Sequence, residues 1–233
     1  GLFLLATTIP VSRIIRNRPE DMGLMPDGDP QTSGDVRSEH SESADEAAEE
    51  TPEPDFTARQ AVRTPVFWVL AFIHMTSTIS IVTLAVHLVP KLNDMGFSLT
   101  GASVVVSTYT GVALVTQFVA GYLGDRLPKP PLILFFLLLQ ATSLLVLALT
   151  ESKEMAFVFA GLYGLGIGGR IPLMTAIRGD YFGRKAFATI MGFSMLPNNL
   201  GMMVAPLFAG YMFDMRGSYL IPFMGFAAMN FAG

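Results

Sequence analysis

The sequence predicts an all-α protein that crosses a membrane several times, and three observations lead to this prediction. Only 15% of the 233 residues are charged and 51% are hydrophobic, whereas soluble domains carry about 25% charged residues. Several windows contain no Asp, Glu, Lys or Arg over the length of about 20 residues that a helix needs to cross a bilayer. These windows also lack the polar stripe that a surface helix of a soluble protein keeps on its outer face.

The beginning of the chain differs in character from the rest. Residues 1–9 have the composition of the end of an apolar helix, and we expect the chain to be an internal fragment of a longer membrane protein. Residues 10–63 form a linker that contains 13 of the 19 acidic residues and six of the 15 basic ones. A segment of this composition cannot bury enough apolar surface to fold, so it is predicted to be largely disordered.

Six apolar spans follow the linker, and each is predicted to be a membrane helix of one bundle that covers residues 64–233. Short loops with charged residues separate them, and Arg170 is the only charged residue within a span. The last span is expected to be incomplete. The predicted bounds are 64–90, 97–122, 131–150, 155–177, 186–213 and 219–233.

The distribution of basic residues predicts the orientation of these spans. Loops 10–63, 123–130 and 178–185 carry eleven Lys and Arg residues, whereas the loops on the other side carry three. Cytoplasmic loops of membrane proteins hold the excess of Lys and Arg. The acidic linker is therefore predicted to be cytoplasmic.

The composition also argues against several functional classes. The absence of cysteine excludes disulfides, thiolate metal sites and thiol catalysis. No basic run or basic face suggests a nucleic-acid partner. The histidines within the spans have no acidic residue near them in sequence, so no catalytic set, metal site or bound cofactor is predicted, and the protein is not expected to be an enzyme.

Small residues and prolines indicate how two of the spans pack. Ala160, Gly164 and Gly168 recur at a spacing of four residues, which favours close helix contact in a membrane. Pro172 and Pro197 can bend their helices. Bent, glycine-rich helices suit a protein that moves between conformations, although static packing uses glycine equally well.

One loop carries a recognisable motif. Residues 121–129 read GYLGDRLPK, which resembles the G-x-L-a-D-R-x-G-R/K loop of the major facilitator superfamily, except that Pro128 stands where the family usually has Gly. Residues 16–28, 64–70, 178–193 and 213–219 also resemble, in order, segments of bacterial members of the oxalate–formate and monocarboxylate type. The resemblance extends over nearly the whole chain.

The resemblance implies a position within the family's twelve-helix bundle. The chain would contain the end of helix six, the central linker, helices seven to eleven and the start of helix twelve. The N-terminal half of the same transporter would be its partner. The loop motif, with Gly121, Gly124, Asp125 and Arg126, would act as a latch that forms in one conformation and breaks in the other.

Polar residues within the spans are the candidate substrate-binding groups. At about 1.5 Å of rise per residue, Arg170 lies roughly 12 Å from the cytoplasmic edge of its span. An intramembrane charge is costly and usually functional, and an arginine can bind a carboxylate through two parallel hydrogen bonds. If their faces turn inward, the candidate residues line one polar cavity, and these are Arg170, His74, Gln117, Asn198, Asn199 and Tyr109.

Each candidate also has a structural alternative. Arg170 could extend toward the cytoplasm or bind carbonyl groups freed by Pro172. The two asparagines could cap a break at Pro197. His74 could carry a proton or simply form a buried hydrogen bond.

The sequence therefore predicts half of a secondary transporter, working as an antiporter or symporter. Its expected substrate is a small solute such as a monocarboxylate or another organic anion, and its expected mechanism is alternating access. The expected location is a bacterial inner membrane or a plasma membrane. The alternative is a membrane sensor that signals through the acidic loop.

Overall fold

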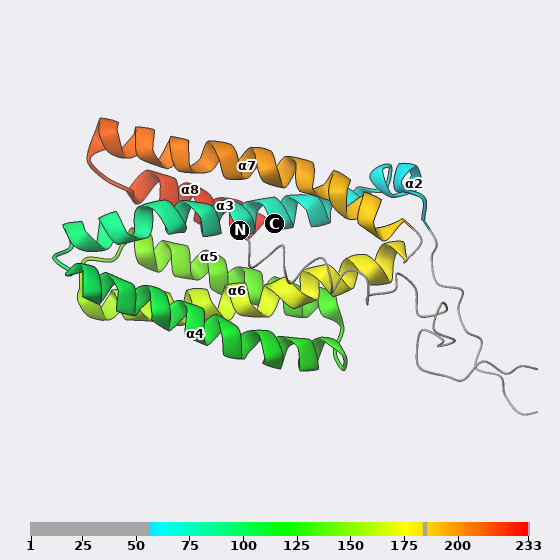
Figure 1. Ribbon diagram of the computed structural model, residues 1–233, viewed down its shortest axis with the longest axis horizontal. Helices are drawn as coiled ribbons and strands as arrows, with labels where there is room; N and C mark the ends of the chain where they lie inside the picture. The colour runs from blue at the N-terminus through cyan, green and yellow to red at the C-terminus, as the bar shows by residue number, and fades with distance from the viewer. Residues whose placement is uncertain (1–55, 184–185, 233) are drawn as a thin grey trace, which may run out of the picture. The chain divides into compact units, whose positions relative to one another are not determined.

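The computed structural model describes residues 56–183 and 186–232, which contain helices and no strand (Figure 1). The expectations for residues 1–9 and for the linker up to residue 55 lie outside these described residues. All the described residues belong to one compact unit, which begins at Thr51. Its helices are α2 (Ala58–Val62), α3 (Pro65–Asp94), α4 (Leu99–Gly124), α5 (Lys129–Ala148), α6 (Lys153–Phe182), α7 (Phe187–Arg216) and α8 (Leu220–Ala232). The all-α prediction is confirmed.

Each predicted span overlaps one helix, but most helices extend beyond the apolar window. Helices α3, α4 and α6 begin directly after Thr64, Ser98 and Ser152, whose side chains accept a hydrogen bond from the backbone N–H three residues later. Such N-caps satisfy donors that a helix leaves free. The largest difference is at the end of α6, which was expected at residue 177 and continues to Phe182.

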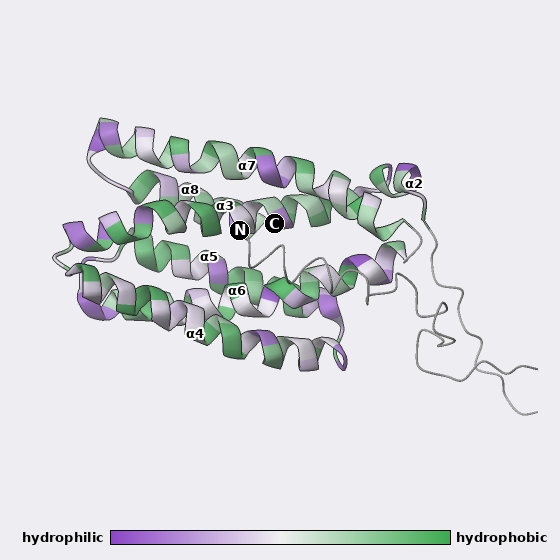
Figure 2. Ribbon diagram, viewed as in Figure 1, coloured by the Kyte–Doolittle hydropathy of each residue, from purple (hydrophilic) through white to green (hydrophobic). Residues whose placement is uncertain are grey.

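The described helices differ in their suitability for crossing a membrane. Helices α3, α4, α5 and α6 are long and apolar enough to do so, and Figure 2 shows hydrophobic residues along much of their length with several hydrophilic residues at their ends. Helix α7 has 30 residues but is not among the helices that meet this criterion. Pro197, Asn198 and Asn199 lower the hydropathy near its centre. Helix α8 has 13 residues.

Glycines set the packing of α6 against its two main neighbours. A methyl group added at Gly164 or Gly168 would meet the backbone of α4, at Tyr109 and Ala113 respectively, at 2.4–2.5 Å. On another side of α6, the same addition at Gly166 would meet the backbone of Gln140 on α5. Close packing in a membrane depends on van der Waals contact between such small residues. The expected close-packing role of Gly164 and Gly168 therefore holds for the contact between α6 and α4.

Two groups of buried hydrogen bonds connect α3 to other helices. The Ser77 hydroxyl donates to Oε1 of Gln140, and Nε2 of Gln140 donates to the carbonyl of Ser77. Asn230 on α8 donates through Nδ2 to the carbonyl of Thr76 and to the hydroxyl of Ser80. All five side chains are fully buried. These bonds fix the rotation of α3 relative to α5 and α8.

Candidate functional site

Arg170 is the central feature of the candidate site. It lies on α6 after a glycine-rich stretch, and only 1% of its surface is exposed. Its Nε and Nη1 atoms have no hydrogen-bond partner among the described residues. In this structure these two donors are therefore shielded from solvent and do not bind the carbonyls near Pro172.

A tyrosine and a histidine lie close enough to this arginine to interact with it electrostatically. Tyr163 lies seven residues before Arg170, which is two helical turns and the same face of α6. It is fully buried, its hydroxyl has no partner among the described residues, and it interacts electrostatically with Arg170. The Tyr109 ring on α4 packs edge-on against Tyr163, with 5.4 Å between ring centroids. His74 on α3 is within electrostatic range of Arg170 and has an unpartnered buried Nδ1.

The structure therefore groups only some of the predicted residues. Arg170, His74 and Tyr109 belong to one region, together with Tyr163, which the sequence analysis did not select. Asn198 is buried on α7, where its Nδ2 donates to Sδ of Met202 and its Oδ1 is unpartnered. Asn199, the next residue along α7, is exposed.

Gln117 completes the predicted set. It is half-buried on α4, and its side chain forms no hydrogen bond with any residue of the described part of the chain. None of the six predicted residues lines the crevice between α3, α5 and α6 or the apolar hollow between α3, α7 and α8. The polar cavity that the sequence analysis predicts therefore stays a prediction.

The predicted latch loop lies at the end of α4. Gly124 is buried, and a Cβ there would lie 2.4 Å from Cδ2 of Leu173 on α6, whereas nothing lies within 4 Å of such an atom at Gly121. Asp125 and Arg126 are exposed. The Arg126 guanidinium lies 3.9 Å from the centre of the Tyr122 ring. The two charged side chains are therefore accessible to a partner.

A second buried arginine was expected in a loop and is instead part of α6. Arg178 is 1% exposed, and its Nη1 and Nη2 donate to the carbonyls of Met174 and Leu70. It thereby connects α6 to α3 with its charge directed at backbone carbonyls. The loop assignment was wrong because a charge was taken to end the span, although arginine donors can satisfy carbonyl groups within a helix bundle.

Other polar residues that the sequence analysis did not use have structural partners. Gln140 and Asn230 form the bonds to α3 described above. His87, near the far end of α3, accepts or donates through Nδ1 with the Tyr219 hydroxyl and donates through Nε2 to the carbonyl of Pro206. The side-chain amide donors of Gln140 and Asn230 have acceptors, whereas Nε and Nη1 of Arg170 have none among the described residues, and the sequence does not reveal this difference.

The arrangement around Arg170 suits a small anion better than chemical catalysis. A guanidinium with two free donors and a nearby phenol hydroxyl can share the oxygens of one carboxylate. Among the described residues, no group of three or more His, Cys, Asp or Glu could hold a metal ion. No acidic side chain of the described part lies within 4.0 Å of the Arg170 guanidinium to neutralise it.

Comparison with known proteins agrees with the family resemblance seen in the sequence. The sequence profile of the Major Facilitator Superfamily matches residues 66–233. Monocarboxylate transporter 13 of Rattus norvegicus is 26% identical over 150 residues, and the protein of the same name from Bos taurus is 25% identical over 150 residues. Each match covers 64% of this chain and 35% of the relative, so the chain matches about a third of the length of these relatives. Both relatives are mammalian and give no support to a bacterial membrane.

Proposed function

Because the chain belongs to the Major Facilitator Superfamily, we propose that it is part of a secondary transporter for a small organic anion. Family membership and the apolar helices support an integral, multi-pass membrane protein that transports small solutes. The proposal narrows the substrate to monocarboxylates and the mechanism to alternating access. The relatives named monocarboxylate transporter support this substrate class at 25–26% identity.

The observation that carries the proposal is the buried, unpartnered guanidinium of Arg170. Burying an isolated charge is strongly unfavourable unless another group compensates it. In Arg178 the carbonyls of two residues provide that compensation, whereas Nε and Nη1 of Arg170 have none among the described residues. A carboxylate substrate would supply the missing acceptors and the opposite charge.

The remaining residues have proposed roles around this group. Tyr109 packs against Tyr163 and holds the Tyr163 ring in position beside the substrate. His74 donates or accepts a hydrogen bond at the substrate. Asn198 and Gln117 contribute to the same pathway from α7 and α4, and Asn199 is the weakest of the proposed contacts because it is exposed.

Alternating access requires contacts that change between states. We assign this role to Asp125 and Arg126, with Gly121 and Gly124 shaping the loop. A carboxylate can interact with the positive N-terminal end of a helix. The proposed contact of Asp125 would lie in the other half of the transporter.

The decisive experiment is carboxylate flux into proteoliposomes that contain the full-length protein. We expect saturable uptake of a labelled monocarboxylate in the wild type and its loss in Arg170→Gln. Arg170→Lys should retain part of the affinity, since it keeps the charge but loses the paired hydrogen bonds. The matched control is Arg216→Gln, which replaces an exposed arginine at the C-terminal end of α7. This variant should transport normally.

A binding measurement separates the anion site from the transport cycle. A monocarboxylate should raise the melting temperature of the wild type, and its uncharged amide should not. The same carboxylate should leave the melting temperature of Arg170→Gln unchanged. Uptake that Arg170→Gln does not affect would refute the anion site, and binding without any flux would favour the sensor alternative.

A further inference from the structure

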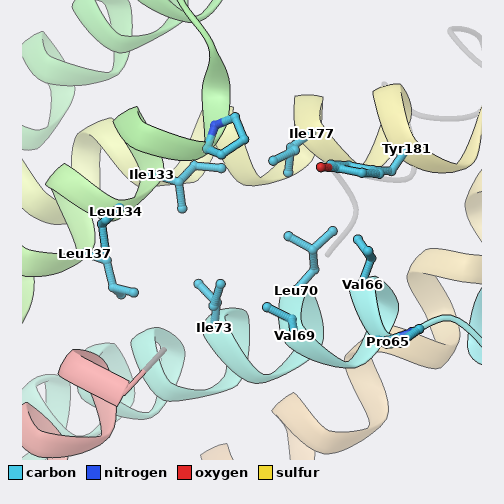
Figure 3. Close-up of a pocket in the computed structure, with 11 residues that line it drawn as sticks. Pro65, Val66, Val69, Leu70, Ile73, Ile133, Leu134, Leu137, Ile177 and Tyr181 are labelled. Carbon is cyan, nitrogen blue, oxygen red and sulfur yellow. The ribbon is translucent and has the colours of Figure 1, made fainter.

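An apolar crevice lies between α3, α5 and α6, and none of the candidate substrate-binding residues lines it. Its volume is about 340 Å³, and its lining is predominantly apolar. Figure 3 shows side chains from α3 on one side of this space and side chains from α5 and α6 on the other. The lining residues are Pro65, Val66, Val69, Leu70, Ile73, Pro130, Ile133, Leu134, Leu137, Ile177 and Tyr181.

The depth of the crevice corresponds to one leaflet of a bilayer. Pro65 is the first residue of α3, and Ile73 lies eight residues further, which is about 12 Å along the helix. The hydrocarbon core of a bilayer is about 30 Å thick, so one leaflet contributes about 15 Å. Three helices that qualify as membrane spans form the walls. The crevice thus begins at the membrane surface and ends near the middle of the hydrocarbon.

Aromatic residues near this end of the helices have the character of a membrane interface. Tyr181, which lines the crevice, is 44% exposed. Trp68, near the start of α3 but outside the lining, is 54% exposed, and its indole N–H donates to the carbonyl of Val62. Trp and Tyr are enriched at the level of lipid headgroups. Arg59 and Arg63, both exposed, precede α3 at the same end.

The charge at this end is complementary to an anionic headgroup. Leaving aside the buried Arg178, four Lys or Arg and two Asp of the described residues lie at the end where α3 and α5 begin, which we call the basic end. The opposite end has three basic and four acidic residues. Each basic residue near an anionic lipid surface contributes favourably to binding.

We propose that the crevice is a binding site for an anionic phospholipid. One acyl chain occupies the space between α3 and α5, and the phosphate lies at the mouth beside Arg63. The acyl chain matches the apolar lining, and the negative phosphate matches the positive charge at the basic end. A lipid held there packs between helices whose direct contact is limited, so it stabilises the position of α3 relative to α5.

Photo-crosslinking of the full-length protein in phosphatidylcholine nanodiscs tests the proposal. The probe is phosphatidylglycerol with a photoreactive group in its acyl chain, present in trace amount, and the adducts are mapped by mass spectrometry. We expect adducts on residues 65–73 and 133–137. Val69→Trp fills the mouth from an exposed position on α3 and should abolish them, whereas Val115→Trp, at an exposed position on α4, should not.

The headgroup is tested with a second probe and a second variant. Phosphatidylglycerol should label the crevice about five-fold more strongly than a phosphatidylcholine probe with the same chain, and Arg63→Gln should remove most of this difference. Labelling of the crevice no stronger than that of the α4 face around Val115 would overturn the proposal. The proposal would also be overturned if the chain's own segment before residue 56 occupied the crevice. Mass spectrometry would then show crosslinks within the protein in place of lipid adducts.

Discussion

The contact between α4 and α6 provides a sharp test of the described packing, through Gly168→Ala. A Cβ at Gly168 would lie 2.4 Å from the carbonyl oxygen of Ala113 and 2.7 Å from its Cα. Carbon atoms in favourable contact are about 3.5–4.0 Å apart. The two backbones would therefore need to separate by about 0.8 Å or more, since neither atom belongs to a side chain that can rotate away.

The expected change in the free energy of unfolding of Gly168→Ala combines two opposing effects. Overpacking of this kind costs about 1–3 kcal/mol. Replacing a helical glycine by alanine contributes about 0.5–1 kcal/mol in the other direction, because alanine loses less conformational freedom on folding. Gly161 on the same helix isolates the second effect, because no atom lies within 4 Å of a Cβ added there.

The comparison of Gly168→Ala with Gly161→Ala is the measurement. Equilibrium unfolding of the full-length protein in detergent should give Gly161→Ala the higher stability, by about 1–3 kcal/mol. Gly169→Ala should fall between them, because its Cβ would meet the ring of Phe136, which can shift. If Gly168→Ala is as stable as Gly161→Ala, the close backbone contact between α4 and α6 is incorrect.

Further substitutions test the polar contacts of Gln140, Arg178 and Lys129 by the same unfolding measurement. Gln140→Leu should destabilise the protein by about 1–3 kcal/mol because it leaves the buried Ser77 hydroxyl unsatisfied, and an added Ser77→Ala should recover part of the loss. Arg178→Gln should cost a similar amount, since the protein loses the buried guanidinium bonds to the carbonyls of Met174 and Leu70 that join α6 to α3; an unchanged stability would refute its structural role. Lys129→Ala should cost less than about 1 kcal/mol, because its ion pair with Asp180 is solvent-accessible.

The helices were predictable because the membrane imposes a simple requirement on composition. A window without charges and with about 20 apolar residues has few alternatives to a spanning helix. The positions of the helix ends were predicted less accurately, for a physical reason. Capping residues such as Thr64 and Ser152 are polar, and charged residues such as Asp94 and Asp180 can extend a helix into the headgroup region, so the helix continues beyond the apolar window.

The candidate site was only partly predictable because side-chain direction depends on neighbouring helices. Asn198 and Asn199 are adjacent in sequence, yet one is buried and the other exposed. Successive residues of a helix point about 100° apart, so depth in the membrane does not determine which of them faces the bundle. Tyr163 gave no sequence signal because a tyrosine in an apolar span is common and its partners lie on other helices.

Arg170 and Arg178 show what the structure adds to the sequence. Both are arginines on α6, and both are 1% exposed. Sequence distinguished them only by their position relative to the apolar window, which placed one in the membrane and the other in a loop. Their hydrogen bonds differ. The guanidinium of Arg178 donates to carbonyls of α3 and α6, whereas two donors of Arg170 have no acceptor among the described residues. A buried donor that the fold leaves unsatisfied is unfavourable in the absence of a ligand, and for that reason Arg170 is the residue at which a ligand has the most to gain.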